Sequence, residues 1–305
     1  MTRAGLPKQP GVHTEHYHAL SSSCIHTTMM TEMDSGQLIT DRAERLAAGR
    51  AKLAASGKTP RQRGKEKIRL ALDWIYRWGY SSPTVIDILS GTARCGFPMK
   101  LVKHGLCTRT RTASGGMVEG VPNFFLTLTD LGITEAERFR ETLLDYEVDP
   151  YRVNQAQMRH DLLAQTATAN LLMQGKIKDF RTERELSGKK EADRKVPDVA
   201  WIEKNLNTAV EVELSAKWSR KLDEFVTRAV KSLLPGPNDE PPRFDRIAVV
   251  SDSPAILKRY KEAFSSDAIL NYWGLDKHNH WRIQESEPMP EGISAKISWY
   301  DLSEF

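Results

Sequence analysis

One short segment of the chain constrains the fold more than any other. Val210, Val212 and Leu214 alternate with Glu211 and Glu213, which is the period-2 pattern of a strand with one apolar face. Because side chains alternate between the two faces of a strand, a pairing slip of one residue would send both glutamates into the core. The segment therefore predicts a strand whose acidic side chains gather on the face away from the core.

A second apolar run, Val196–Ile202, precedes this strand, and a polar turn rich in Asn and Lys joins the two. We expect the runs to pair antiparallel, with Trp201 opposite Val210 and Val199 opposite Val212, because that register puts the apolar side chains on one face.

The same register predicts a cluster of carboxylates on the other face, with Asp198 opposite Glu213 and Glu211 one pair along. Carboxylates this close repel one another and raise each other's pKa unless a cation lies between them. Hard oxygen ligands of this kind suit Mg²⁺ or Mn²⁺. The pattern therefore favours a divalent-metal site.

These residues carry a family resemblance. Pro197-Asp198, a spacer, Glu211-Val212-Glu213 and the nearby Lys217 resemble the PD-(D/E)XK core of restriction endonucleases and many DNA-repair nucleases. The stretch from His160 to Lys231 is similar, more narrowly, to the replication-relaxation family and the related MobC-type plasmid mobilisation proteins. The matching pieces are Arg159-His160-Asp161, Thr182-Glu183-Arg184-Glu185-Leu186, Pro197-Asp198 and Glu211-Val212-Glu213-Leu214-Ser215-Ala216-Lys217.

The resemblance implies roles for individual residues. Asp198 and Glu211 would be the ligands of Mg²⁺ or Mn²⁺, and Glu183 the carboxylate donated by the preceding helix. The chain departs from the standard motif at Glu213, where the motif has Lys. Some restriction enzymes carry Glu there, and Lys217 could restore the cation. His160 is either an assistant of the metal site or a structural histidine.

Residues 66–148 have the pattern of a winged helix. Apolar residues recur at helical spacing from Ile68 to Trp78, Ser82-Pro83 is an N-cap signal for a second helix, and Pro98–His104 forms a third. Strands at residues 106–112 and 123–129 follow. In such a domain the third helix enters the major groove, so the candidate DNA contacts are Arg94, Lys100 and Lys103, with Arg109 and Arg111 near the wing. Winged helices also mediate protein–protein contacts, and interleaved Arg and Thr on the wing strand favour DNA.

The segments before this domain are polar. Residues 1–40 are expected to be a disordered leader, whose His13, His16, His18, Cys24 and His26 are alternatively a transition-metal site. Residues 41–65 form a basic arm that includes Arg61 and Arg63 and could neutralise phosphates; a solvated linker is the alternative.

Residues 150–305 are expected to form the nuclease-like domain, after a linking helix at 133–146 with Phe139, Leu143 and Leu144 as its apolar stripe. The predicted helices cover 158–173, a segment after Lys217, and 253–264; predicted strands lie at 246–250, 281–283 and 296–300. The predicted fold class is α/β (α+β): a winged helix-turn-helix followed by a restriction-endonuclease-like mixed sheet.

Composition narrows the class of protein. The net charge is only +4 over 305 residues, so a nucleic-acid signal must come from local clusters. The three cysteines show no paired spacing, and no apolar run reaches membrane-spanning length. We expect a cytoplasmic protein with no membrane partner.

Together these features predict a Mg²⁺- or Mn²⁺-dependent endonuclease that acts on double-stranded DNA. The resemblance implies nicking or relaxation in plasmid mobilisation or replication, with other proteins of those systems as partners and a homodimer as one option. Two alternatives stay open: a non-catalytic DNA-binding regulator or relaxosome accessory protein with a degenerate nuclease fold, and a nuclease subunit of a transposition or defence system.

Overall fold

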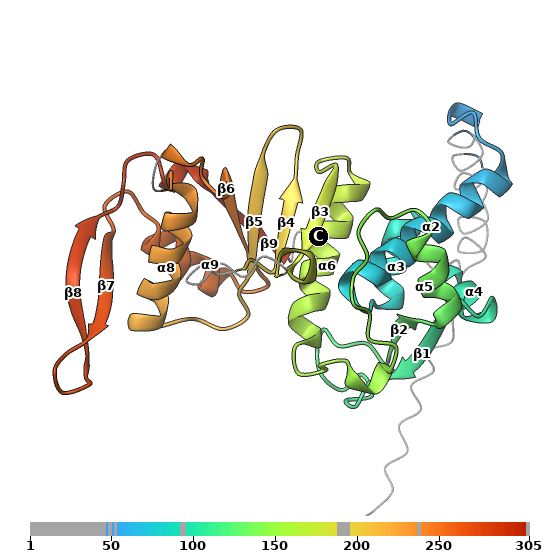
Figure 1. Ribbon diagram of the computed structural model, residues 1–305, viewed down its shortest axis with the longest axis horizontal. Helices are drawn as coiled ribbons and strands as arrows, with labels where there is room; N and C mark the ends of the chain where they lie inside the picture. Colours follow the sequence, from blue (N-terminus) through green and yellow to red (C-terminus); the bar gives the residue numbers. More distant parts are fainter. Residues whose placement is uncertain are drawn as a thin grey trace, which may run out of the picture. The chain divides into compact units, whose positions relative to one another are not determined.

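The computed structural model describes residues 47, 51, 54–91, 96–187, 196–236 and 239–302. The chain divides into two units, residues 1–59 and Pro60–Phe305. All of the elements below belong to the second unit, which is mixed α/β (Figure 1). In the part of the chain that the structure describes, no helix combines the length and apolar character needed to cross a membrane.

The first part of this unit is built from three helices and a hairpin. The helices are α2 (Pro60–Trp78), α3 (Pro83–Ser90) and α4 (Phe97–Lys103); the antiparallel strands are β1 (Cys107–Arg111) and β2 (Phe124–Leu128). Ser82 caps α3 by accepting a hydrogen bond from the backbone of Val85 at 3.2 Å. The predicted order of elements is confirmed. The arm was predicted to run to residue 65, and its last residues, with Arg61 and Arg63, lie in the first turns of α2.

The predicted linking helix is also wrong in its bounds. The helix α5 covers only Asp130–Glu137, and Phe139 and Leu143 are exposed beyond it. Residues 138–146 do not continue the helix, because polar groups in this segment form hydrogen bonds with residues far away in the sequence. The backbone N–H of Leu144 donates to the Tyr76 hydroxyl at 2.8 Å, and the Tyr146 hydroxyl donates to the Gly79 carbonyl at 2.7 Å.

A five-stranded mixed sheet forms the centre of the second part. Its strands are β3 (Asp179–Thr182), β4 (Val199–Ile202), β5 (Asn207–Val212), β6 (Arg246–Ser251) and β9 (Ile297–Asp301), and they lie in the order β3-β4-β5-β6-β9. The pairs β3–β4 and β4–β5 are antiparallel, whereas β5–β6 and β6–β9 are parallel.

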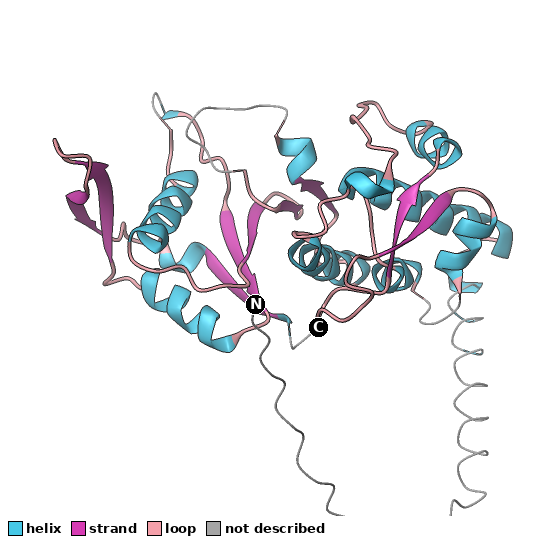
Figure 2. Cartoon of the chain, turned by 90° about the horizontal axis from the view of Figure 1, so that it is seen from below, coloured by secondary structure: helices cyan, strands magenta, loops and turns pink. Residues whose placement is uncertain are grey.

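Helices cover both faces of this sheet (Figure 2). The helix α6 (Met158–Met173) shares a core with Val210 and Val212, whereas α8 (Arg220–Leu233) and α9 (Pro254–Ala263) share a second core with Ala209. The predicted helices at 158–173 and 253–264 and the predicted strand at 246–250 are confirmed. Because both faces are covered, Glu211 of β5 and Glu213 just after it are buried, although the pattern predicted a strand with only one face against the core.

The predicted register between β4 and β5 is wrong by two residues. Val199 pairs with Val210, and Trp201 pairs with Thr208. The cause is the tight turn between the strands, which the backbone N–H of Glu203 closes by donating to the Leu206 carbonyl at 2.9 Å. A shift of two keeps every side chain on its predicted face. It removes Asp198 from its predicted place opposite Glu213.

A short helix, two 3₁₀ turns and a hairpin accompany these elements in the described part of the unit. The helix α7 (Glu183–Leu186) follows β3, and single 3₁₀ turns lie at Pro150–Arg152 and Ser294–Lys296. A separate antiparallel hairpin, β7 (Ile269–Leu275) with β8 (Trp281–Pro288), packs beside α8. The predicted strands at 281–283 and 296–300 are confirmed, and β7 was not predicted.

Candidate functional site at the end of the mixed sheet

The strand register brings the backbones of three predicted site residues to one end of the sheet. Thr182 pairs with Val199, and Val199 pairs with Val210. Glu183, Asp198 and Glu211 each lie one residue from a paired position at this end: Glu211 is within β5, Asp198 directly precedes β4, and Glu183 is the first residue of α7.

Asp198 is held between the backbone of β5 and a histidine of α6. One of its carboxylate oxygens accepts a hydrogen bond from the Val212 N–H at 2.7 Å and lies 3.2 Å from His160 Nε2. The other ring nitrogen of His160 lies 3.2 Å from a carboxylate oxygen of Asp161. Burial alone would lower the pKa of His160, but the hydrogen bonds and charges of Asp161 and Asp198 outweigh it and raise that pKa to about 10. His160 is therefore a cation at neutral pH.

Glu213 belongs to a second cluster, formed with side chains from the following loop and from α9. Its carboxylate makes an ion pair with Lys217 and accepts a hydrogen bond from the Tyr260 hydroxyl at 2.9 Å. Burial and the charges of Glu213 and Glu211 raise the pKa of Tyr260, so its hydroxyl stays protonated and continues to donate. Glu211 lies close enough to contribute to this shift, and both glutamates are less than a tenth exposed.

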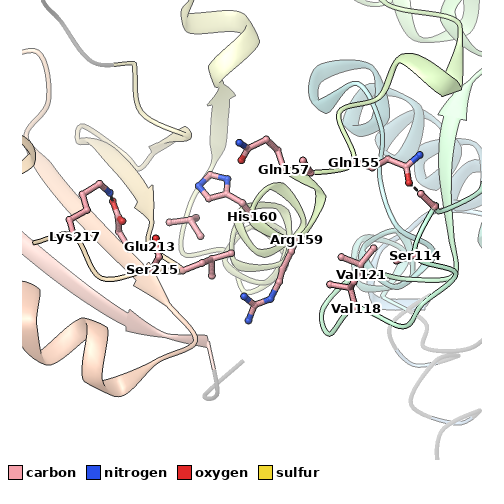
Figure 3. A pocket seen from close by; sticks show the side chains of 14 residues that line it. Ser114, Val118, Val121, Gln155, Gln157, Arg159, His160, Glu213, Ser215 and Lys217 are labelled. Carbon is pink, nitrogen blue, oxygen red and sulfur yellow. Dashed lines mark hydrogen bonds and ion pairs between the residues drawn. The ribbon is translucent and has the colours of Figure 1, made fainter. Parts of the chain in front are cut away.

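A cleft of about 760 Å³ opens beside these clusters. The loop between β1 and β2 forms one wall, and the end of β5 with the loop after it forms the other. Between them lies the segment that enters α6 (Figure 3). Arg159, His160 and Lys217 line it as cations, and Glu213 is its carboxylate. The cleft thus lies between the helical part of the unit and the sheet. More positive than negative side chains line it.

Arg159 fixes one side of this cleft. Its guanidinium makes an ion pair with Asp252, which follows β6. A Cβ on Gly120, in the β1–β2 loop, would lie 3.2 Å from the Arg159 side chain, so the loop packs closely against it.

The Thr182–Leu186 motif has a mainly structural role apart from Glu183. The side chains of Thr182 and Glu185 cap α7 reciprocally, and Glu185 also binds Arg77 and Arg140. The Arg184 guanidinium donates to the Tyr76 carbonyl at 2.8 Å. Glu183 itself is exposed at the first position of α7.

The predicted DNA contacts of the first part lie on its surface. Lys100 and Lys103 are exposed on α4, and Arg109 and Arg111 are exposed on β1, where the Arg109 guanidinium lies 4.1 Å from the Phe124 ring centre. Arg61 is exposed and Arg63 is half-buried on α2. Arg94 and the histidine cluster of the leader lie outside the described residues.

Sequence reasoning missed two residues of the site, Asp161 and Tyr260. Asp161 follows His160 directly and was noted only as part of a motif. No local signal marks Tyr260, because α9 reaches Glu213 from 47 positions along the chain.

Asp198 and Glu211 carry the type of donor that Mg²⁺ binds, although Asp198 contacts His160 of α6 and Glu211 lies near Tyr260 of α9. Mg²⁺ is commonly bound through one or two carboxylates, with water and substrate phosphates completing the octahedron. Among the residues that the structure describes, no group of three or more His, Cys, Asp or Glu side chains is arranged to bind a metal ion. A metal would therefore compete with His160 for Asp198.

Comparison with known proteins adds little to this geometry. No family model matches the chain, and no curated protein matches it. The crystal structure of protein VC1899 from Vibrio cholerae is a weak structural neighbour, with 14% sequence identity and a TM-score of 0.25. The match covers 68% of this chain, which spans about half (51%) of that neighbour.

Proposed function

We propose that this protein binds double-stranded DNA and nicks it by metal-dependent hydrolysis in the cleft at the end of the sheet. One observation carries the proposal: a cleft lined by Arg159, His160 and Lys217 lies beside the strand ends that hold Asp198 and Glu211. Cations attract and orient phosphates, and carboxylates such as those of Asp198 and Glu211 are donors that a phosphate-bound Mg²⁺ takes.

The binding half of the proposal rests on interpreting α2, α3, α4 and the β1–β2 hairpin as a winged helix. Lys100 and Lys103 project from the third helix of this arrangement, which is the element that enters the major groove in such domains. Arg109 and Arg111 are exposed next to the loop that forms one wall of the cleft. DNA held by α4 would thus continue along the β1–β2 loop toward the sheet.

The catalytic half assigns a role to each side chain of the cleft. Asp198 and Glu211 would hold the metal, which supplies an activated water and stabilises charge on the scissile phosphate. Lys217 would donate to a phosphate oxygen as negative charge develops there. Tyr260 positions Glu213, which in turn orients Lys217. Arg159 and His160 bind the flanking phosphates.

A second candidate function follows from the ion pairs of the site. His160 already neutralises Asp198, and Lys217 already neutralises Glu213. A protein that keeps these pairs would be a DNA-binding regulator or accessory factor without catalysis. The biological setting in either case, plasmid mobilisation or replication, rests on the family resemblance.

Cleavage of supercoiled plasmid in Mg²⁺ or Mn²⁺ tests the proposal. We expect open-circle product from the native protein, and none from Asp198→Ala or Glu211→Ala. Glu203→Ala is the matched control, because Glu203 lies in the turn at the opposite end of the same two strands; it should nick normally. Intact DNA binding without any metal-dependent product would overturn the catalytic proposal and favour the second candidate.

A further inference from the structure

We propose that a strip of paired tryptophan and arginine side chains beside the cleft binds unpaired nucleotides of single-stranded DNA. The strip consists of Trp218 with Arg259 and Trp281 with Arg220. The inference goes beyond the proposed nicking, because the strip would bind a separated strand whether or not a bond is cut.

The strip begins where the cleft ends. Trp218 directly follows Lys217, a residue of the cleft wall, and Arg220 follows two residues later as the first residue of α8. A strand leaving Lys217 would therefore meet these side chains next.

Both tryptophans offer a ring to solvent. Trp218 is 64% exposed and Trp281 is 46% exposed, whereas Trp74 and Trp201 are almost fully buried. The exposed part of an indole ring makes no packing contacts with the hydrophobic core of its own chain. This exposed part of the apolar surface is therefore available for another flat ring.

Each of these tryptophans is paired with an arginine. The Arg259 guanidinium lies 3.0 Å from the ring centre of Trp218, and the Arg220 guanidinium lies 4.1 Å from that of Trp281. Arg259 also donates to the Lys217 carbonyl at 3.3 Å, which ties the first pair to the cleft. In the described part of the chain no carboxylate forms an ion pair with Arg259, and its side chain is half-buried.

The backbone between the two pairs is held in an uncommon conformation. Ser219 has a φ of 46°, in the left-handed region that residues other than glycine rarely adopt. Its carbonyl accepts the backbone N–H groups of Leu222 and Asp223, at 2.9 and 3.0 Å, which begins α8. Such conformations persist where the surrounding structure requires them, and they concentrate at functional sites. Here the strained turn sets the directions of Trp218 and Arg220.

Aromatic rings interleaved with arginines match the chemistry of a single strand. Bases with unpaired edges stack on aromatic faces, and the guanidinium groups neutralise the phosphates between them. A duplex hides its base faces within the stack, so this strip should discriminate against it. The partner assigned is thus DNA with separated strands, such as the displaced strand next to a nick.

Fluorescence anisotropy in EDTA tests the assignment, because binding to the strip needs no metal. The probes are a labelled oligo(dT) of about 15 nucleotides and a labelled duplex of the same length. Trp218→Ala should weaken oligo(dT) binding about 5- to 150-fold, the range for one lost base stack, and leave duplex binding unchanged. Trp218→Phe should keep most of the affinity, since a phenyl ring still stacks.

Phe139→Ala is the matched control, because Phe139 is 57% exposed and the Arg69 guanidinium lies 4.1 Å from its ring centre. It should bind oligo(dT) like the native protein. Native affinity for oligo(dT) in both Trp218→Ala and Trp281→Ala would overturn the assignment, and so would an equal loss of duplex binding. Trp218-dependent oligo(dT) binding in a protein that never nicks plasmid would contradict the proposed catalysis alone.

Discussion

Glu185 is predicted to be a major source of stability, although it lies only two residues from the candidate catalytic Glu183. Its carboxylate accepts hydrogen bonds from Arg77 Nε at 3.0 Å, Arg140 Nη2 at 3.0 Å and the Thr182 backbone at 2.9 Å. Arg77 belongs to α2, so this carboxylate joins the helical part of the unit to the edge of the sheet.

The size of the effect follows from burial. The side chains of Arg77 and Glu185 are 8% and 13% exposed. Removing one partner of a buried pair costs about 3–5 kcal/mol, because the other charge is left uncompensated. Arg77 keeps Asp179 at 2.9 Å and the Phe180 carbonyl, which reduces the cost. We therefore expect Glu185→Ala to lower the free energy of unfolding by about 2–4 kcal/mol, which corresponds to a fall in melting temperature of roughly 4–16 °C.

Urea denaturation followed by circular dichroism measures the effect. The midpoint should fall for Glu185→Ala, with a smaller fall for Glu185→Gln, which keeps the shape and loses the charge. Glu183→Ala is the control from the same helix. Because Glu183 is exposed, its loss should cost less than about 1 kcal/mol. Equal midpoints for Glu183→Ala and Glu185→Ala would refute the reasoning.

Two further predictions concern the packing of the helical part. Gly132→Ala should destabilise by about 1–3 kcal/mol or more in urea, because a Cβ there would lie 2.0 Å from the Leu106 carbonyl oxygen. Gly64→Ala should instead leave the free energy of unfolding unchanged or raise it, because a Cβ at this position of α2 would meet open space. A loss of stability in both variants would contradict the packing. Burial raises the pKa of the Cys107 thiol to about 12, so in a Cys24→Ser, Cys95→Ser background it should react with a thiol reagent at pH 8 only after unfolding. Rapid labelling of the folded protein would show that the thiol is accessible.

Periodic apolar patterns identified most of the elements. The helix at 158–173 was predicted to the residue, although its apolar periodicity is weak and its buried positions include Gln165 and Thr168. The face of each residue in β4 and β5 was also predictable, since a shift of two residues leaves the alternation unchanged. The register of the two strands could not be predicted, because the geometry of the tight turn between them sets it.

Long-range contacts account for the remaining errors. The end of α5 depends on Tyr76, which bonds to the Leu144 backbone 68 positions away. Thr182 and Glu185 have the spacing of a capping box, which the sequence does reveal. The partners of Glu185 do not follow from that spacing, because Arg77 lies 108 positions away. In the candidate site, likewise, spacing identified Asp198, Glu211 and Glu213 but could not show that His160, Lys217 and Tyr260 contact two of these three carboxylates.

The central claim is that the strand ends at Asp198 and Glu211 hold a divalent metal. Isothermal titration of the native protein with Mn²⁺ measures this directly, without DNA or turnover. We predict binding that is lost in both Asp198→Ala and Glu211→Ala and kept in Glu203→Ala. No binding by the native protein, or equal binding by all of the variants, would contradict the claim.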